Sequence, residues 1–236
     1  MTGANKGIGK ETARQLAALG ITVWIGARNE QRGEAAEADL CVDGADVRYV
    51  LLDVTNADTI ESAVARIDAE HGHLDILVNN AVIVGASGWH PPDKTSVDDV
   101  RELYETNVFG VLAVTNAMLP LLHRAAGGRI VNVSSSLGSL QLAAGPPHAS
   151  HDSQGAVIGY SSSKSALNMI TLIYARALGG TPIKVNAVDP GYCATDLNGF
   201  QGFISAADGA SVVVDAATLA DDGPTGSFLG AELISW

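Results

Sequence analysis

The sequence predicts a single doubly wound α/β domain, with a parallel sheet covered by helices on both faces. Short β-branched apolar runs alternate with helix-like stretches along the whole chain, which is the pattern of right-handed βαβ crossovers. Several runs are apolar almost throughout, as strands buried on both faces of a sheet must be. Of the 236 residues, 47% are apolar and 17% are charged, which supplies a large core and excludes intrinsic disorder. We expect residues 1–236 to form one domain.

The predicted elements follow one another in a regular order. Strands are expected at residues 21–27, 47–54, 74–81, 129–135, 183–189 and 227–236. Helices are expected at residues 9–19, 30–40, 57–71, 97–118, 160–178 and 210–219. In the third helix, Ile60, Val64 and Ile67 recur at i, i+4 and i+7 and form one apolar stripe. Residues 138–159 are rich in Gly, Pro, Ser and His and predict a long loop, which in a compact domain usually has a function.

The charge of the chain restricts its partners. A formal net charge of −12 repels phosphate backbones and anionic lipids, so we expect no nucleic-acid and no membrane partner. The apolar run nearest to a membrane span, residues 106–122, contains Asn107, Asn116 and Pro120 and is too polar. The first residues lack the apolar region of a signal peptide. Two cysteines are too few for disulfides to stabilise a domain of this size. We therefore expect a cytoplasmic protein.

Three glycines, Gly3, Gly7 and Gly9, lie at the opening of the first predicted helix. Glycine lets the backbone turn sharply and approach a pyrophosphate, whose charge the helix N-terminus then stabilises. The same residues are compatible with an ordinary tight turn, and the spacing G-x3-G-x-G differs from the commoner G-x-G-x-x-G. The segment is a candidate phosphate-binding loop of a dinucleotide site.

The strand expected at residues 21–27 is followed by Arg28 and has no acidic residue at its tip. NAD-binding proteins usually place a carboxylate there, which accepts a hydrogen bond from the ribose 2′-hydroxyl. A guanidinium instead offers a bidentate fork suited to a 2′-phosphate, and Lys6 in the glycine loop adds a second positive charge. Either cation alone is commonly a solvated surface residue. Together with the missing acid, they favour NADP over NAD.

Tyr160 and Lys164 are four residues apart in a predicted helix and therefore lie on one face of it. A phenol has a pKa of about 10, and a neighbouring ammonium lowers that pKa, which suits acid–base catalysis. A Tyr-x3-Lys pair also arises by chance. Two predicted strands end in polar residues, Asn80 and Ser135, at the sheet edge where ligands bind in open α/β folds.

Seven motifs in this order resemble those of the short-chain dehydrogenase/reductase family. They are T-G-x3-G-I-G at residues 2–9, Leu52-Asp53-Val54, Asn79-Asn80-Ala81, Thr106-Asn107-Val108, Val133-Ser134-Ser135, Tyr160-x3-Lys164 and Pro190-Gly191. The resemblance runs over almost the whole chain. It implies a Rossmann-type NADP-dependent oxidoreductase, similar to the carbonyl reductases. Such an enzyme transfers a hydride between NADPH and a ketone or aldehyde, or a secondary alcohol in reverse.

The resemblance also implies the site residues. In the catalytic tetrad, Tyr160 would protonate the carbonyl oxygen while Ser135 hydrogen-bonds it as a neutral donor. Lys164 would bind the nicotinamide ribose and lower the pKa of Tyr160, and Asn107 would hold a water. The implied cofactor-binding residues are Gly3, Asn5, Lys6, Gly7, Ile8, Gly9, Arg28, Asp53, Val54, Asn80, Tyr160, Lys164, Pro190, Gly191 and Thr195.

Two internal features depart from the family's pattern. Val82 stands where the family has a glycine after Asn-Asn-Ala, which puts the local backbone geometry in question. Ser135 and Tyr160 are farther apart than is common in the family. The additional residues fall in 138–159, which we expect to form an inserted loop beside the substrate cleft.

The third departure is at the N-terminus, where the family has a hydrophobic strand and this sequence has only Met1 before the glycine motif. In a sheet of order 3-2-1-4-5-6 that first strand is central. Without it, buried backbone groups lack partners, and each costs about 1–3 kcal/mol. We therefore expect the first central strand to be missing from this sequence, through an N-terminal truncation or a start codon assigned too late.

Residues 192–210 form the expected substrate-side segment. Five bulky side chains are candidates for an apolar substrate pocket: Trp89, Leu140, Tyr192, Leu197 and Phe200. We expect the partner to be a small-molecule carbonyl or alcohol. The sequence leaves open which one it is, and whether the protein is a monomer or a homo-oligomer.

Two other functions are compatible with parts of the sequence. Residues 161–164 match the S-x-x-K motif of penicillin-binding enzymes, but the partner motifs S-D-N and K-T-G are absent. A non-catalytic NADP-binding sensor of the same fold would keep the glycine loop without needing Tyr160 or Lys164, and it is the alternative to an enzyme. We expect no metal site, because no histidine pair is accompanied by further ligands at suitable spacing.

Overall fold

The computed structural model describes the chain except for residues 86–91 and 146–156. Its strands are β1 (Val23–Ala27), β2 (Val47–Leu51), β3 (Ile76–Asn79), β4 (Arg129–Val133), β5 (Lys184–Val188) and β6 (Phe228–Leu229). Its α-helices are α1 (Gly7–Ala18), α2 (Glu30–Leu40), α3 (Ala57–His71), α4 (Val97–Tyr104), α5 (Gly110–Leu122), α6 (Leu140–Ala144), α8 (Ile158–Ala177) and α9 (Ala206–Ala217). Strands and helices alternate as predicted, and the doubly wound α/β fold is confirmed.

All strand pairs of the described chain are parallel, but the sheet is in two parts. β1 pairs with β2, and a second part has the order β3-β4-β5-β6. Between β1 and β3 lie Met1 and Thr2. There Thr2 forms a single bridge to Gly26, and its N–H donates to the carbonyl of Val78 at 3.0 Å. Thr2 therefore connects the two parts of the sheet.

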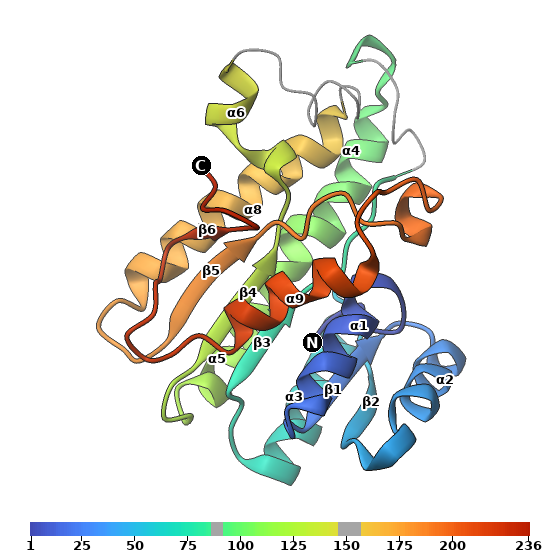
Figure 1. The fold of residues 1–236 in the computed structure, drawn as a ribbon, viewed down its shortest axis with the longest axis vertical. Helices are drawn as coiled ribbons and strands as arrows, with labels where there is room; N and C mark the ends of the chain where they lie inside the picture. The colour runs from blue at the N-terminus through green and yellow to red at the C-terminus, as the bar shows by residue number, and fades with distance from the viewer. Residues whose placement is uncertain (86–91, 146–156) are drawn as a thin grey trace.

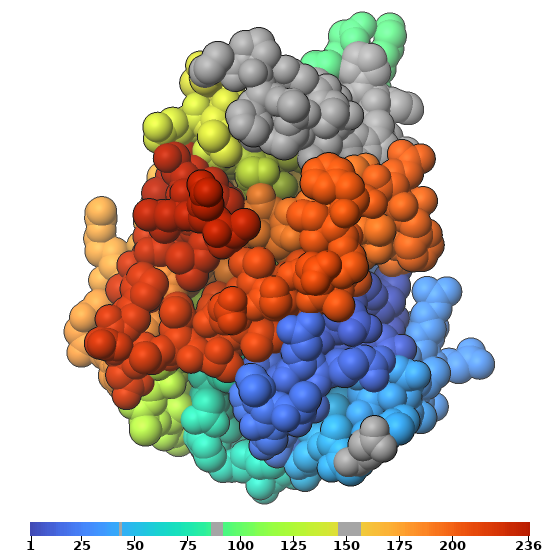
Figure 2. All heavy atoms as spheres, viewed as in Figure 1, coloured from blue at the N-terminus to red at the C-terminus, as the bar shows by residue number. Residues whose placement is uncertain are grey.

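Helices cover both faces of the sheet (Figure 1). One core lies under α1 and α9, where Ala13, Leu16 and Val213 belong to the same buried cluster as Ile25 of β1. In the space-filling view α9 lies directly beside α1 (Figure 2). The other core lies under α3, α5 and α8. Its buried side chains include Ile60, Ala63, Ile67, Val114, Met118, Leu121, Leu122, Ala175 and Leu178.

Capping side chains set several helix ends. Asn56 accepts hydrogen bonds from the N–H groups of the first turn of α3, and Gly72 ends that helix in the left-handed region with φ of 72°. Ser205 accepts a hydrogen bond from the N–H of Asp208 and starts α9 at Ala206, earlier than the predicted residue 210.

Three segments differ from the predicted elements. The helix predicted at residues 97–118 contains a π-helical turn at Glu105–Phe109 and continues through α5. The loop predicted at residues 138–159 contains α6 and the start of α8 in its described part. The last predicted strand, residues 227–236, is reduced to the two residues of β6. After β6 the chain folds back on itself, since the N–H of Ile234 donates to the carbonyl of Phe228 at 2.8 Å.

One helical stretch of the described chain, Val97–Leu122, is long and apolar enough to cross a membrane by length and composition. Half of its most apolar window is buried inside the protein. The side chains of Val114, Met118 and Leu122 on this stretch belong to the core beneath the sheet. We interpret it as a core helix.

A buried polar chain crosses the centre of the sheet. Asn79 on β3 donates to Thr115 on α5 at 3.0 Å and to Asn132 on β4 at 2.8 Å. Asn132 in turn donates to Thr171 on α8 at 2.9 Å. All four side chains are buried, so each depends on the others for its hydrogen bonds. This network joins four elements, of which β3, β4 and α8 lead to the cleft described below.

Replacing Asn132 by alanine should lower the free energy of unfolding by about 2–4 kcal/mol, because the buried groups of Asn79 and Thr171 each lose a partner. Urea titration followed by circular dichroism measures the change. Asn116→Ala is the matched control. Its exposed side chain accepts a hydrogen bond from Tyr174, and we expect a loss below about 1 kcal/mol. Equal losses in the two variants would contradict the role given to the buried network.

Candidate active site

The glycine loop lies tightly against the end of β3. Gly3 has φ of 62° and Gly7 has φ of 55°, a region that favours glycine. A Cβ on Gly3 would lie 2.8 Å from the Cα of Ala81. Both features require glycine, so the loop conformation follows directly from the sequence. Val82, by contrast, has no left-handed φ, so the departure from the family's glycine is accommodated without backbone strain.

Asn80 and Thr2 tie the loop to the sheet. The Oγ1 of Thr2 accepts hydrogen bonds from the N–H groups of Asn80 and Ala81, both at 3.0 Å. The Nδ2 of Asn80 donates to the carbonyls of Thr2 at 2.9 Å and Gly3 at 3.0 Å. A Cβ on Gly9 would lie only 2.4 Å from that Nδ2. Asn80 therefore shapes the loop as well as lining the cleft.

A cleft of about 1330 Å³ opens above the glycine loop. It is lined by these expected cofactor residues: Gly3, Asn5, Lys6, Gly7, Ile8, Gly9, Arg28, Asp53, Val54, Asn80 and Thr195. The N-terminus of α1 has no side-chain cap and no acidic residue in its first turn, so an anion fits there. Asp53 keeps one carboxylate oxygen bound to Thr55.

The two predicted phosphate ligands differ in their surroundings. Arg28 forms none of the ion pairs in the described part of the chain, whereas Lys6 pairs with Asp196. Asp196 lies in a single 3₁₀ turn, Asp196–Asn198, next to Thr195, and it also lines the cleft. The sequence reasoning missed Asp196, because only the fold brings it across the cleft to the glycine loop.

A second cavity of about 790 Å³ contains Ser135, Tyr160 and Lys164. α8 carries Tyr160 and Lys164 one turn apart, while Ser135 follows β4 at the carboxyl edge of the sheet. Pro190 and Gly191, which follow β5, line the same cavity. The two cavities share the lining residues Ile8, Asn80, Val82, Val84, Thr195 and Leu197. They therefore form one continuous cleft, with the glycine loop, Lys6 and Arg28 at one end and the hydroxyl groups of Ser135 and Tyr160 at the other.

Burial dominates the electrostatics of the hydroxyl end. It raises the pKa of Tyr160 well above its usual value, the charge of Asp189 raises it further, and a side-chain hydrogen bond with Ser135 lowers it. The net shift is upward, and the lowering of this pKa by Lys164 stays a prediction. The Nζ of Lys164 lies 5.5 Å from the centre of the Tyr160 ring.

Burial also acts on Lys164, whose pKa falls to about 8, while the charge of Asp189 opposes that shift. The ammonium donates to the carbonyl of Val133 at 2.7 Å. Asp189 holds the neighbouring backbone, because its carboxylate accepts from the N–H of Ser136 at 2.9 Å and of Gly191 at 2.8 Å. The sequence reasoning did not single out Asp189.

Asn107 lies in the π-helical turn and is buried. Its side chain accepts from the N–H of Ile83 at 3.0 Å, and it donates to the carbonyl of Ile83 at 3.0 Å and to Ser163 at 3.2 Å. It is not among the residues that line either cavity. In this structure it joins the segment after β3 to α8, and its expected water-holding role stays a prediction.

The candidate substrate residues divide into three groups. Tyr192 and Leu197 line the cavity with Tyr160. Leu140 and Phe200 are each 69% exposed and do not line it, so their assignment to the pocket is wrong for the described structure. Trp89 lies outside the described residues. A phosphate-binding loop joined to a Ser–Tyr–Lys cavity is the arrangement of a dinucleotide-dependent oxidoreductase.

The chain belongs to the short-chain dehydrogenase family, whose sequence pattern it matches over residues 1–202. It is 37% identical over 222 residues to the short-chain dehydrogenase anuI of Penicillium roqueforti, covering 92% of this chain and 87% of that protein. It is 32% identical over 301 residues to the salutaridine reductase of Papaver bracteatum, covering 100% and 94%. The resemblance derived from the motifs is confirmed, and the protein is an oxidoreductase of this family.

Solved structures agree with the fold. The NADPH-bound carbonyl reductase from chicken fatty liver has a TM-score of 0.87 and 27% identity, covering 100% of this chain and 97% of that chain. The salutaridine reductase of Papaver somniferum has a TM-score of 0.84 and 30% identity, covering 96% and 97%.

The pKa of Lys164 leads to a test by pH. Its value in the folded protein, about 8, lies below the ordinary value of 10.5, so the unfolded state binds more protons between these two pH values. The stability of the wild type should therefore rise, relative to Lys164→Met, as pH increases from about 8 to about 10. We expect a relative gain of about 1–3 kcal/mol, measured by urea unfolding of both proteins at each pH. Parallel pH profiles would show that Lys164 is not destabilised by burial.

Proposed function

We propose that this protein is an NADPH-dependent reductase of ketones or aldehydes, with Tyr160 as the acid. The observation that carries the proposal is the convergence of Ser135, Tyr160 and Lys164 in a cavity continuous with the glycine-loop cleft. The relatives and solved structures whose names include reductases, and the neighbour that holds NADPH, support it.

The cleft fits NADP better than NAD. Gly3 and Gly7 bring the backbone and the N-terminus of α1 to the place of a pyrophosphate. Arg28, which is free of ion pairs among the described residues, would hold the 2′-phosphate, with Lys6 as a second cation. Asp53, which lines the same cleft, would contact the adenine. When bound, NADPH supplies the hydride that reduces the carbonyl carbon.

The protein's own residues would handle the proton. A raised pKa keeps Tyr160 protonated at neutral pH, so its hydroxyl is ready to donate a proton to the carbonyl oxygen. Ser135, within hydrogen-bonding reach of Tyr160, would hold the same oxygen as a second donor. Lys164, buried beside them, would bind the nicotinamide ribose. A protonated phenol is the form that reduction of a carbonyl group requires.

The same site separates the enzyme from the non-catalytic NADP-binding sensor. Burial of Tyr160 and Lys164 in one cavity costs desolvation energy, and it shifts the pKa of both groups. A sensor that only binds NADP does not need this buried pair. NADPH binding without turnover of any aliphatic, aromatic or cyclic ketone would favour the sensor.

We further propose a cytoplasmic location, which the acidic charge and the two free cysteines favour.

Tyr160→Phe should lower kcat for ketone reduction by at least about 100-fold, because it removes the proton donor and leaves the ring in place. The dissociation constant for NADPH should change less than threefold, since the phosphate-binding end is untouched. NADPH absorbance gives the rate, and fluorescence titration gives the affinity. Tyr174→Phe on the same helix is the control and should keep full activity. A Tyr160→Phe enzyme with more than a tenth of the wild-type rate would refute Tyr160 as the acid.

The wild type should use NADPH with a higher kcat/KM than NADH, and Arg28→Asp should reverse part of this preference. We expect kcat/KM for NADPH to fall about tenfold to a hundredfold, because a charge-assisted contact worth about 1.5–3 kcal/mol is lost. Steady-state rates with both nucleotides measure the ratio. Arg32→Asp, an exposed change on the adjoining turn of α2, should leave the ratio unaltered. Equal efficiency with NADH and NADPH in the wild type would contradict the assignment.

A further inference from the structure

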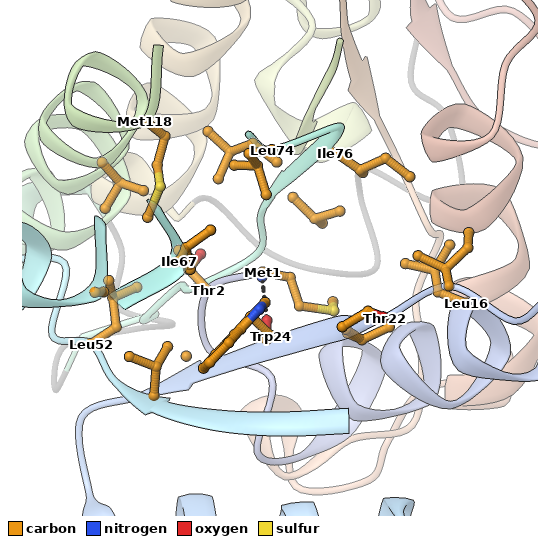
Figure 3. A pocket seen from close by; sticks show the side chains of 18 residues that line it. Met1, Thr2, Leu16, Thr22, Trp24, Leu52, Ile67, Leu74, Ile76 and Met118 are labelled. Carbon is orange, nitrogen blue, oxygen red and sulfur yellow. Dashed lines mark hydrogen bonds between the residues drawn. The ribbon is translucent and has the colours of Figure 1, made fainter. Parts of the chain in front are cut away.

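Two cavities of the protein differ in the side chains that line them. Leu16, Ile67 and Met118 surround the first, of about 650 Å³, and no charged side chain is among its described lining residues (Figure 3). The second is the cavity of about 790 Å³ around the catalytic hydroxyl groups, and it is lined by the charged side chains of Lys164 and Asp189. A charge in a partly desolvated place is costly unless it is paired or hydrogen-bonded. The proposed chemistry uses Lys164, and it gives Asp189 no part.

Both oxygens of the half-buried Asp189 carboxylate accept hydrogen bonds from the backbone. Oδ2 accepts from the N–H of Ser136 at 2.9 Å, and Oδ1 accepts from the N–H of Gly191 at 2.8 Å. The N–H of Asp189 itself donates to the carbonyl of Leu229 on β6 at 2.8 Å. Asp189 therefore ties the segment after β4 to the turn after β5, and both Ser136 and Gly191 line the cavity.

The bond from Ser136 acts on Ser135, its neighbour in the chain. On the other side of Ser135, the N–H of Ser134 donates to the carbonyl of the last residue of β5 at 2.7 Å. The backbone is thus held to β5 and its extension on both sides of Ser135. The hydroxyl of Ser135 shares a hydrogen bond with Tyr160. The carboxylate therefore helps to fix the direction in which this hydroxyl points.

The charge of Asp189 acts on both reactive side chains. Burial lowers the pKa of Lys164 to about 8, and the carboxylate opposes that shift; burial raises the pKa of Tyr160, and the carboxylate adds to that shift. The other titratable side chains that line the cavity are Tyr192 and Cys193. Burial raises the pKa of the Cys193 thiol to about 11, so it is uncharged at neutral pH. Asp189 is the only carboxylate among the described residues that line this cavity.

We propose that Asp189 is a positioning residue of the reductase site, which fixes Ser135 and the turn at Gly191 and stabilises the ammonium of Lys164 by its charge. This inference rests on the proposed function, because it assigns these side chains to one reaction. Without the carboxylate, Ser135 loses its fixed direction and Lys164 loses the charge that opposes its burial. Asp189 acts through these residues and transfers no proton itself.

Urea unfolding tests the effect of the charge without nucleotide or substrate. The wild type should gain stability over Lys164→Met as pH rises above about 8, the pKa of Lys164 in the folded protein. Asp189→Asn keeps the shape of the side chain and removes its charge, which lowers that pKa further. Between Asp189→Asn and the double variant with Lys164→Met, the gain should therefore begin about one pH unit lower. A role in structure alone would lower stability at every pH without moving this window.

Steady-state kinetics test the positioning. In Asp189→Asn, kcat for ketone reduction should fall at least about tenfold, because Ser135 is no longer held in place. Asp189→Glu restores the charge on a longer side chain, so it should recover the pH window of the wild type while kcat stays low. Asp208→Asn is the matched control, since this exposed carboxylate lies in the first turn of α9. It should leave both the window and kcat unchanged.

An unmoved pH window in Asp189→Asn, or a kcat within about threefold of the wild type, would overturn the proposal. If Asp189→Asn does not fold, Asp189→Glu decides: a wild-type window with a lowered kcat supports the proposal, and a wild-type kcat contradicts it. A protein that reduces no ketone would refute the proposed function. The pH window is measured without ligands, so it still decides whether Asp189 acts on Lys164.

Discussion

The close approach of the glycine loop to the end of β3 is the contact on which the site depends. Gly3 lies against Ala81 with no room for a side chain, and the amide of Asn80 holds the loop through two carbonyls. This contact aims the N-terminus of α1 into the cleft. Because Asn80 also lines the cavity that holds Tyr160, one residue connects the glycine loop to the hydroxyl end of the cleft.

Desolvation is the second organising effect. Tyr160 and Lys164 both have pKa values displaced by burial, the first upward and the second downward, so each is biased toward its neutral form. Asp189 opposes the effect on Lys164 and adds to that on Tyr160. The same carboxylate holds Ser136 and Gly191 through their N–H groups, and it thereby couples the backbone after β4 to that after β5. The electrostatics of the site and its backbone geometry thus share one residue.

The sequence predicted the parts of the structure that local physics determines. Short β-branched runs gave most of the strands, and Gly3 and Gly7 predicted a loop that only glycine can form. Tertiary contacts determine the features that were missed. The π-helical turn holds Asn107, whose side chain hydrogen-bonds to the distant Ile83. Ser139 caps α6 and also donates to the carbonyl of Ser235. Leu140 and Phe200 have the right chemistry for a pocket, but the backbone directs them to solvent.

The ion pair between Lys6 and Asp196 has a consequence for how the cleft responds to ionic strength. A phosphate that recruits Lys6 must first separate it from Asp196, so nucleotide entry exchanges one ionic contact for another. Dissolved salt screens the contact that is broken as well as the contact that is formed. The two effects oppose each other, and the affinity for a phosphate-bearing nucleotide becomes less dependent on salt than the number of cations in the cleft implies. Asp196 therefore acts as a counterion of Lys6 within the protein, and it reduces the effect of dissolved salt on nucleotide affinity.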